Sequence, residues 1–170
     1  FVSKFSGGVL RGDEHFHKHV LSLDWYTPTF WKFVLTSSIK IGTIKMLDVK
    51  NSNEWIPPYE RFIMGGNGIP YGTMLRGYPD NSVGPLSSQG RSFGGNTMIK
   101  YSTEFRFPFS ENPVVYAMLF AEAGNVWNDS QLMHSLALER KNPIDLKRSA
   151  GIGIRFFMPM IGMLGFDMGY

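Results

Sequence analysis

Hydrophobic and polar residues alternate along most of this chain with a period of two. In the segment 96–109 the odd positions are apolar residues or Thr, whereas the even positions include Lys100, Glu104 and Arg106. Successive side chains of a β-strand point to opposite faces, so this segment is expected to form a strand with one apolar and one charged face. No long segment carries apolar residues at helical spacing. The pattern therefore predicts an all-β fold.

The alternation predicts about seven strands. A first strand ends near Leu10, and five further segments follow the same pattern or are fully apolar: 15–26, 30–46, 114–127, 146–158 and 164–170. Within 114–127 the only ionisable residue is Glu122. Most of these strands, at roughly 12 to 16 residues, exceed the length of about 5 to 6 that is usual in globular proteins. They are long enough to cross a lipid bilayer at a tilt.

The connections between these segments differ in length. Proline-containing stretches at 27–29, 110–113 and 159–161 predict tight turns, because the fixed φ of proline suits a turn. The connections at about 47–94 and 128–145 are much longer. Short turns at one end and long loops at the other are typical of an antiparallel transmembrane β-barrel. The alternative is a soluble β-sandwich, but the strand length and the scarcity of Lys and Glu on the polar faces favour the barrel.

Composition excludes several classes of protein. Hydrophobic residues make up 43% of the 170 residues, too many for a disordered chain. The longest uninterrupted apolar run has eight residues, Val114 to Ala121, which is too short for a membrane helix. The chain has no Cys, so it has neither disulfides nor a thiolate metal site. Its net charge of +3 gives no reason to expect a nucleic-acid partner.

The ends of the sequence suggest a piece of a longer protein. Phe1 is neither an initiator Met nor the start of a signal peptide, and Tyr170 ends the chain within an alternating apolar run. Seven strands also conflict with the even strand number of bacterial single-chain barrels. We therefore expect residues 1–170 to be part of a barrel domain, with a long inserted loop at about 47–93.

The long loop carries a group of motifs. Arg61-Phe62 is followed by Gly65-Gly66 and later by Leu75-Arg76-Gly77-Tyr78. The glycines permit positive φ and close backbone approach, but without a Gly-Lys-Ser/Thr sequence they do not indicate nucleotide binding. These motifs resemble the sixth loop of the BamA-type outer-membrane protein insertases, whose signature is written Val-Arg-Gly-Phe/Tyr. Leu75 stands here in place of the usual Val.

The resemblance continues through the following strands. It covers about residues 61–170 through three further segments in the family's order, 94–108, 121–127 and 148–159. Glu122 occupies a position where many members have Asp. The resemblance implies that the chain is the C-terminal part of a barrel of about sixteen strands, an even number as in other bacterial barrels. The closing strand, the opening half of the barrel and the periplasmic POTRA domains lie outside the sequence.

A charged site is expected where the loop meets the barrel wall. A lone carboxylate in an apolar strand, such as Glu122, is costly to bury unless it meets water or a cation. The planar guanidinium of Arg76 can bind both Glu122 and Glu104 in charge-assisted hydrogen bonds. We interpret Arg76, Gly77, Tyr78, Glu104 and Glu122 as a structural latch, in which the loop is held inside the barrel. Hinge and packing roles are expected for further loop residues: Gly65, Gly66 and Leu75. The alternative is that Arg76 is solvated and both Glu residues face water.

Two other groups of residues have weaker interpretations. His15, His17 and His19 share one strand face and have a spacing that could bind a metal, but continuation of the pattern places them at the outer lipid boundary. No metal site is therefore expected. Four aromatic residues near strand ends are interpreted as an interfacial girdle rather than ordinary core: Trp25, Tyr26, Trp31 and Trp127. No arrangement of Ser, His and Asp indicates catalysis.

The resemblance implies a function in the assembly of outer-membrane proteins. The protein would be a multi-pass β-barrel in the outer membrane of a Gram-negative cell, would use no cofactor and would not be an enzyme. It would fold and insert unfolded client proteins, with a sheet edge as template. Accessory lipoproteins, outer-membrane lipids and lipopolysaccharide are the other implied partners.

Two alternatives stay open at this point. The first is a translocation channel of the same superfamily, of the two-partner secretion or TamA-like type. Five POTRA domains upstream would favour the insertase, and two would favour the exporter. The second is a passive porin, which a mobile Arg76 and a freely conducting interior would favour.

Overall fold

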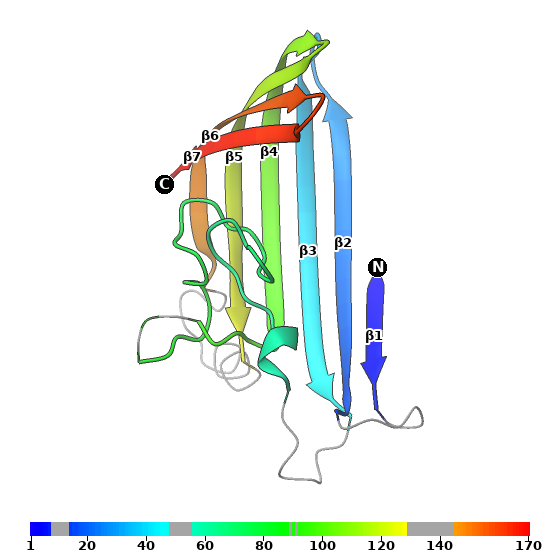
Figure 1. Ribbon diagram of the computed structural model, residues 1–170, viewed down its shortest axis with the longest axis vertical. Coiled ribbons are helices and arrows are strands. Elements are labelled where there is room, and N and C mark those ends of the chain that lie inside the picture. Colours follow the sequence, from blue (N-terminus) through cyan, green and yellow to red (C-terminus); the bar gives the residue numbers. More distant parts are fainter. Residues whose placement is uncertain (8–13, 48–55, 89, 91, 129–144) are drawn as a thin grey trace.

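The computed structural model describes residues 1–7, 14–47, 56–88, 90, 92–128 and 145–170. Seven antiparallel strands form one sheet in sequence order (Figure 1): β1 Val2–Ser6, β2 Phe16–Pro28, β3 Val34–Met46, β4 Thr97–Glu111, β5 Val114–Trp127, β6 Lys147–Met158 and β7 Gly162–Gly169. A short 3-10 helix, η2, covers Pro58–Glu60 within the long loop. No helix in the described part of the chain is long and apolar enough to cross a membrane.

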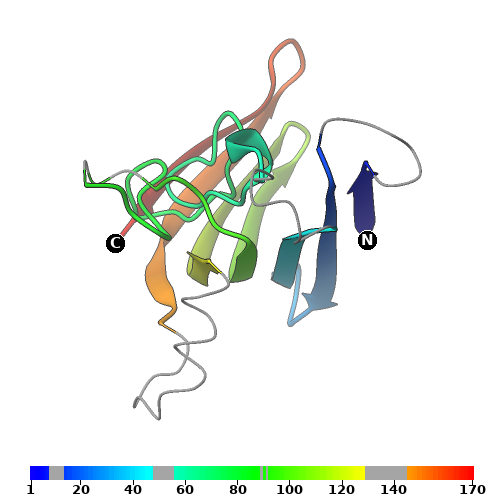
Figure 2. The same ribbon diagram turned by 90° about the horizontal axis from the view of Figure 1, so that it is seen from below.

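The register places charged and apolar residues on opposite faces of the sheet, as the alternation predicts. Ser102 of β4 pairs with Glu122 of β5, and Glu122 pairs with Ser149 of β6. Neighbours in register point to the same side, so these positions share one face. The sheet is curved, and the long loop lies on its concave side (Figure 2). Phe105 and Phe107 occupy the alternate positions and contact each other on the convex side, 4.8 Å between ring centroids.

The strand boundaries differ from the expected ones at the hairpin between β2 and β3. Thr27 pairs with Leu35 and Pro28 with Val34, so β2 continues through the stretch that was expected to be the turn. The reversal instead occurs after Pro28, where Trp31 adopts a φ of 58°. The left-handed conformation turns the chain at Trp31, and β3 therefore begins at Val34 rather than at residue 30. The segment 8–13, in which the first strand was expected to end, and most of the connection 128–145 lie outside the described residues.

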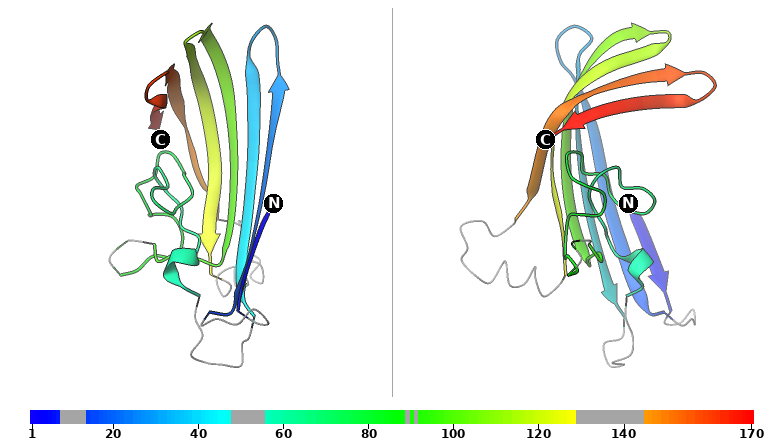
Figure 3. Two further views of the ribbon diagram at one scale, coloured as in Figure 1. Left: turned by 45° about the vertical axis from the view of Figure 1, so that its right-hand side comes forward. Right: turned by 60° about the vertical axis from the view of Figure 1, so that its left-hand side comes forward.

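The core of the molecule lies between the loop and one end of the sheet. Its buried residues come from both parts: Phe16, Ile44, Ile56, Phe62, Met64, Leu75, Val83, Met98 and Val126. Ile44 and Met98 are strand residues on the concave face, and both are at most 1% exposed. The views in Figure 3 show the loop beside this end of β4 and β5. The loop therefore covers apolar concave residues of β3, β4 and β5 at this end of the sheet.

The exposure of the side chains is compatible with an aromatic girdle for only part of its expected members. Trp25 and Trp31 are 45% and 77% exposed, as residues of a girdle should be. Tyr26 points instead to the concave face, where the guanidinium of Arg106 lies 5.9 Å from its ring centroid. Trp127 is only 4% exposed, which contradicts an interfacial position. Alternation explains Tyr26, since it follows Trp25 directly and must occupy the other face.

Candidate functional site

The long loop is held in shape by short backbone bridges of its own. Met64 bridges to both Thr73 and Val83, and Gly66 bridges to Leu75. The first bridge of the loop, Phe62 to Gly95, joins its two ends beside the start of β4. Leu75 is fully buried in the core. These bridges fix the position of Leu75 and therefore the direction in which the next residue, Arg76, leaves the loop.

Gly65 and Gly66 occupy backbone conformations that other residues rarely adopt. Their φ angles are 125° and 56°. A Cβ atom on Gly65 would lie 2.5 Å from the carbonyl oxygen of Pro79, and one on Gly66 would collide with Asp80. Asp80 also accepts a hydrogen bond from the backbone N–H of Asn67, at 2.9 Å. The glycine pair thus lets two stretches of the loop pack together directly.

Arg76 lies at the centre of the site and contacts the barrel wall through its side chain and backbone. Nη2 donates hydrogen bonds to Oε1 of Glu104 at 2.7 Å and to Oε1 of Glu122 at 2.8 Å. The backbone N–H of Arg76 donates to Oε2 of Glu122 at 2.8 Å. The guanidinium also stacks over the ring of Phe120, 3.8 Å from its centroid. The side chain is only 5% exposed, so these contacts replace most of its hydration.

Both carboxylates have further partners on the wall. Glu122 accepts a hydrogen bond from Ser102 at 3.1 Å and forms an ion pair with Lys100 at 3.0 Å. The second oxygen of Glu104 accepts two hydrogen bonds from Arg106, at 3.0 and 2.7 Å. Each acid therefore joins the loop cation to a second cation on β4. Both acids are almost enclosed, with side chains 16% exposed for Glu104 and 1% for Glu122.

A third acid, Asp167, lies at the edge of this network and was not anticipated. Its Oδ1 atom is 3.8 Å from Nη1 of Arg76. Its two oxygens accept hydrogen bonds from Arg155 at 2.8 and 2.7 Å, in a bidentate pair. Arg155 pairs in register with Gly165, where a Cβ atom would lie 2.7 Å from the Arg155 side chain, so this glycine leaves room for it. The alternation placed Asp167 and Arg155 on polar faces, but only the register of β6 and β7 shows that they meet.

Gly77 and Tyr78 extend the contacts of the loop to β6. Gly77 has a φ of 84°, and a Cβ atom there would lie 3.1 Å from Cβ of Ser149 on β6. The hydroxyl of Tyr78 donates a hydrogen bond to the backbone oxygen of Arg148 at 2.9 Å. The structure thus brings together all five residues expected to form the latch. Arg76 binds residues of β4 and β5, and the next two residues, Gly77 and Tyr78, contact β6.

A second charged contact ties the start of the loop to β1 and β2. Glu60, in η2, forms ion pairs with Lys4 and Lys18. Lys18 also donates to the backbone oxygen of Glu60 at 2.7 Å, and its ammonium lies 4.9 Å from the ring centroid of Phe62. Lys4 and Lys18 are register partners on the concave face. We call this cluster of Glu60, Lys4 and Lys18 the second anchor. No residue spacing predicted it, because Glu60 is far from the two Lys residues in the chain.

The pKa values of two charged loop residues, Glu60 and Arg76, are shifted. Burial by itself would raise the pKa of Glu60, but the hydrogen bonds and charges of Lys4 and Lys18 outweigh it and lower that pKa. Burial likewise opposes the charged form of Arg76, while the hydrogen bonds and charges of Glu122 and Glu104 raise its pKa. Both loop residues are thus held in their charged forms by the wall.

Beside the latch is a polar hollow of about 280 Å³ on the concave face. Its lining includes Asp24, Tyr26, Lys100, Arg106 and Arg155. Within the described residues, no group of three or more His, Cys, Asp or Glu side chains is arranged to hold a metal ion. The site is therefore a set of paired charges that can hold a loop against a sheet.

Comparisons with known proteins identify the family and the fold of the chain. The family model of the Omp85 superfamily domain matches residues 1–170. Among solved structures, the chain is similar to BamA from Haemophilus ducreyi lacking POTRA domains 1–3, with a TM-score of 0.70 and 23% sequence identity. The match covers 93% of this chain and 32% of that one, so the chain spans about a third of the length of the solved chain. A search of curated proteins finds no match. The predicted fold, part of a larger antiparallel barrel, is confirmed.

Proposed function

This chain belongs to the Omp85 superfamily, and from that premise we propose that it is the C-terminal part of an outer-membrane β-barrel that folds and inserts client β-barrel proteins. The observation that carries the proposal is the binding of Arg76 to two carboxylates of the sheet. A loop with the Leu75-Arg76-Gly77-Tyr78 sequence is bound to the concave wall of an antiparallel sheet through Glu104 and Glu122. The sheet also has the fold of a BamA barrel.

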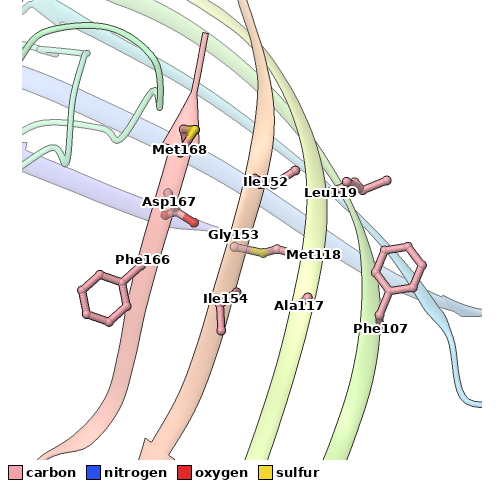
Figure 4. A pocket seen from close by; sticks show the side chains of 10 residues that line it. All are labelled: Phe107, Ala117, Met118, Leu119, Ile152, Gly153, Ile154, Phe166, Asp167 and Met168. Carbon is pink, nitrogen blue, oxygen red and sulfur yellow. The ribbon is translucent and has the colours of Figure 1, made fainter.

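An apolar convex face supports a position in lipid. A shallow hollow of about 430 Å³ crosses β4 to β7 on this face. Figure 4 shows Phe107 and Phe166 at its opposite sides, with Ala117, Ile152 and Ile154 between them. Ile152, Ile154 and Phe166 are each more than half exposed. Apolar surface of this extent, on strands long enough to cross a bilayer, is expected to face hydrocarbon.

The latch gives the proposed insertase a stiff wall. Insertion requires that a client strand pair with an exposed strand edge while the rest of the barrel keeps its shape. The long loop joins β1 and β2, through Glu60, to β4, β5 and β6, through Arg76 and Tyr78. A loop fixed at both positions resists bending of the sheet between them. No covalent chemistry is involved, so we propose that the protein is not an enzyme and needs no cofactor.

Reconstitution of the full-length protein into liposomes tests this proposal. An urea-unfolded β-barrel client is added, and its folding is followed by its heat-modifiable migration on gels. The proposal predicts faster folding than with liposomes that contain a simple porin, and client that is integrated in the membrane and resists urea extraction. Client delivered in soluble form into the liposome interior would instead identify a translocation channel. No acceleration and no delivery would refute both activities.

A further inference from the structure

A small group of polar side chains lies on the convex face of β1 to β3, near the end that carries the long loops. His17 and Lys45 are register partners on β2 and β3, and His19 pairs in the same way with Thr43. Ser3 of β1 is the partner of His19 on its other side. Lys45 is exposed, and both His side chains are partly exposed. We call His17, His19 and Lys45, with Ser3 and Thr43, the headgroup patch.

The two imidazoles in the headgroup patch are held in fixed positions. Nδ1 of His17 and Nε2 of His19 are hydrogen-bonded at 3.0 Å, and Nδ1 of His19 is bonded to Oγ of Ser3 at 2.9 Å. The rings of Phe1 and Phe5 pack against them, with centroid distances of 6.2 Å from Phe1 and 5.4 Å from Phe5 to His19. An arrangement that is ordered before a ligand arrives loses little conformational entropy on binding.

The electrostatics of the patch favour an anion. Among the described residues, neither Lys45 nor His17 has an acidic partner. Within the described part of β1, β2 and β3, the convex positions contain no Asp or Glu, because Asp24 lies on the concave face. The ammonium of Lys45 and an N–H at the free Nε2 atom of His17 can donate hydrogen bonds, and these donors are suited to phosphate oxygens. Both ring nitrogens of His19 are already bonded within the patch, so His19 holds His17 in position.

An apolar surface begins directly beside the patch. Leu21 pairs with Ile41, one step further along the same face, and these residues are 37% and 38% exposed. Leu23 and Trp25 continue this apolar surface along β2 and are 50% and 45% exposed. The face therefore changes from cationic and polar to apolar along the strand direction. A ligand that fits both parts has an anionic head and a hydrocarbon tail.

We propose that the headgroup patch binds the phosphate-bearing headgroup of a lipid in the leaflet that faces the long loops, with its acyl chains on Leu21, Leu23 and Ile41. This inference rests on the proposed function, since that function places the convex face in a membrane. Free inorganic phosphate has the same headgroup chemistry but cannot use the apolar surface. The occupant is therefore a lipid. A Lys near a membrane surface contributes about 1 kcal/mol to binding of anionic lipid, which corresponds to about a fivefold change in affinity.

The test uses the full-length protein in non-ionic detergent, titrated with phosphatidylglycerol and followed by native mass spectrometry. Lys45→Gln is expected to weaken the tightest binding step about fivefold. Combining it with His17→Gln and His19→Gln should remove the preference for phosphatidylglycerol over zwitterionic phosphatidylcholine. Lys32→Gln is the matched control: Lys32 is also exposed but lies at the other end of the sheet, paired with Glu111 at 2.8 Å. It should leave binding unchanged.

Two results would overturn the inference. One is equal affinity for phosphatidylglycerol in the parent protein and in Lys45→Gln, an exposed substitution that leaves the fold intact. The other is displacement of phosphatidylglycerol by inorganic phosphate at phosphate concentrations close to the dissociation constant of the lipid. That result would identify a site for free anions. Lipid binding is measured without a client protein. Failure of the headgroup patch and failure of the insertase activity are therefore separate outcomes.

Discussion

At the scale of single residues, the most demanding feature is the burial of Arg76. Its side chain gives up hydration on entering the site, and four contacts replace it: Glu104, Glu122, Phe120 and the more distant Asp167. For a buried ion pair the desolvation cost cancels much of the attraction, so the net gain in stability is small. Removing one partner is different, because it leaves the others charged, buried and unpaired.

We therefore expect Arg76→Ala in the full-length protein to lower the free energy of unfolding by about 3–5 kcal/mol. Urea titration of the folded barrel, followed by its heat-modifiable migration, measures this change. Arg148→Ala is a suitable control, since that side chain is exposed on β6. Equal stability of Arg76→Ala and the control would mean that Glu104 and Glu122 need no cation from the loop.

Reversal of a wall charge should be more damaging than loss of the loop charge. Glu122→Lys places a third cation next to Arg76 and Lys100, both of which now contact the carboxylate. Glu111→Lys is the matched charge reversal at an exposed ion pair, and it should change stability little because solvent screens exposed charges. The order of urea midpoints is expected to be Glu111→Lys above Arg76→Ala above Glu122→Lys. A different order would show that the network is not electrostatic in origin.

The core of the latch could be predicted from the sequence because each member stood out in its surroundings. Glu122 is the only ionisable residue of an apolar segment, and Arg76 lies in a glycine-rich loop that resembles a known motif. Asp167 and Glu60 could not be found in this way. Their partners, Arg155 for Asp167 and Lys18 for Glu60, become neighbours only through strand register or through the path of the loop.

At the scale of elements, the long loop acts as a strut rather than a simple connection. It is bound to the sheet by the latch near Arg76 and by the second anchor at Glu60. Between these points its apolar side chains share a core with β3, β4 and β5. The predicted pattern of strands was correct because alternation is local. The loop path was not predictable, since it depends on backbone bridges between residues such as Met64 and Val83.

Close packing of Gly77 on β6 gives a test at this scale. Gly77 and Gly90 have similar φ angles, 84° and 77°, so an Ala at either position has similar backbone strain of about 1–2 kcal/mol. At Gly77 a Cβ atom would also lie within 3.3 Å of atoms of Ser149, Gly169 and Tyr170. At Gly90 it would have no neighbour within 4 Å. Gly77→Ala should therefore have a lower thermal midpoint than Gly90→Ala. Equal midpoints would mean that the loop does not press on β6.

The second anchor should make the stability of the protein depend on pH. The pKa of Glu60 is below its ordinary value of 4.5 in the folded protein, so its contribution is present above about pH 4.5. It is lost as the pH falls through the lower folded-state pKa. Thermal midpoints of the full-length protein between about pH 6 and pH 3 should fall more steeply than those of Glu60→Gln. Parallel curves would show that the Lys4 and Lys18 contacts do not contribute to stability.

At the scale of the whole molecule, the sheet is a curved wall with different chemistry on its two faces. The convex face carries exposed apolar residues such as Leu119, Ile152 and Phe166. On the concave face, charged groups gather around Arg76, and apolar groups lie under the loop. The family match explains the wall as a section of a larger barrel. The alternation predicted both faces, but only the fold showed that the loop covers one end of the interior.

The central claim is that Arg76 holds the loop on this wall, and a disulfide test addresses it most directly. This chain has no Cys, and a Cβ atom at Gly77 would lie 3.1 Å from that of Ser149, close to the disulfide range of about 3.5–4.5 Å. The measurement is the yield of the Gly77→Cys/Ser149→Cys cross-link in the full-length protein in membranes, with Gly90→Cys/Ser149→Cys as the control pair. We predict a high yield that falls sharply when Arg76→Ala is added. A yield no higher than the control, or one that Arg76→Ala leaves unchanged, would contradict the account.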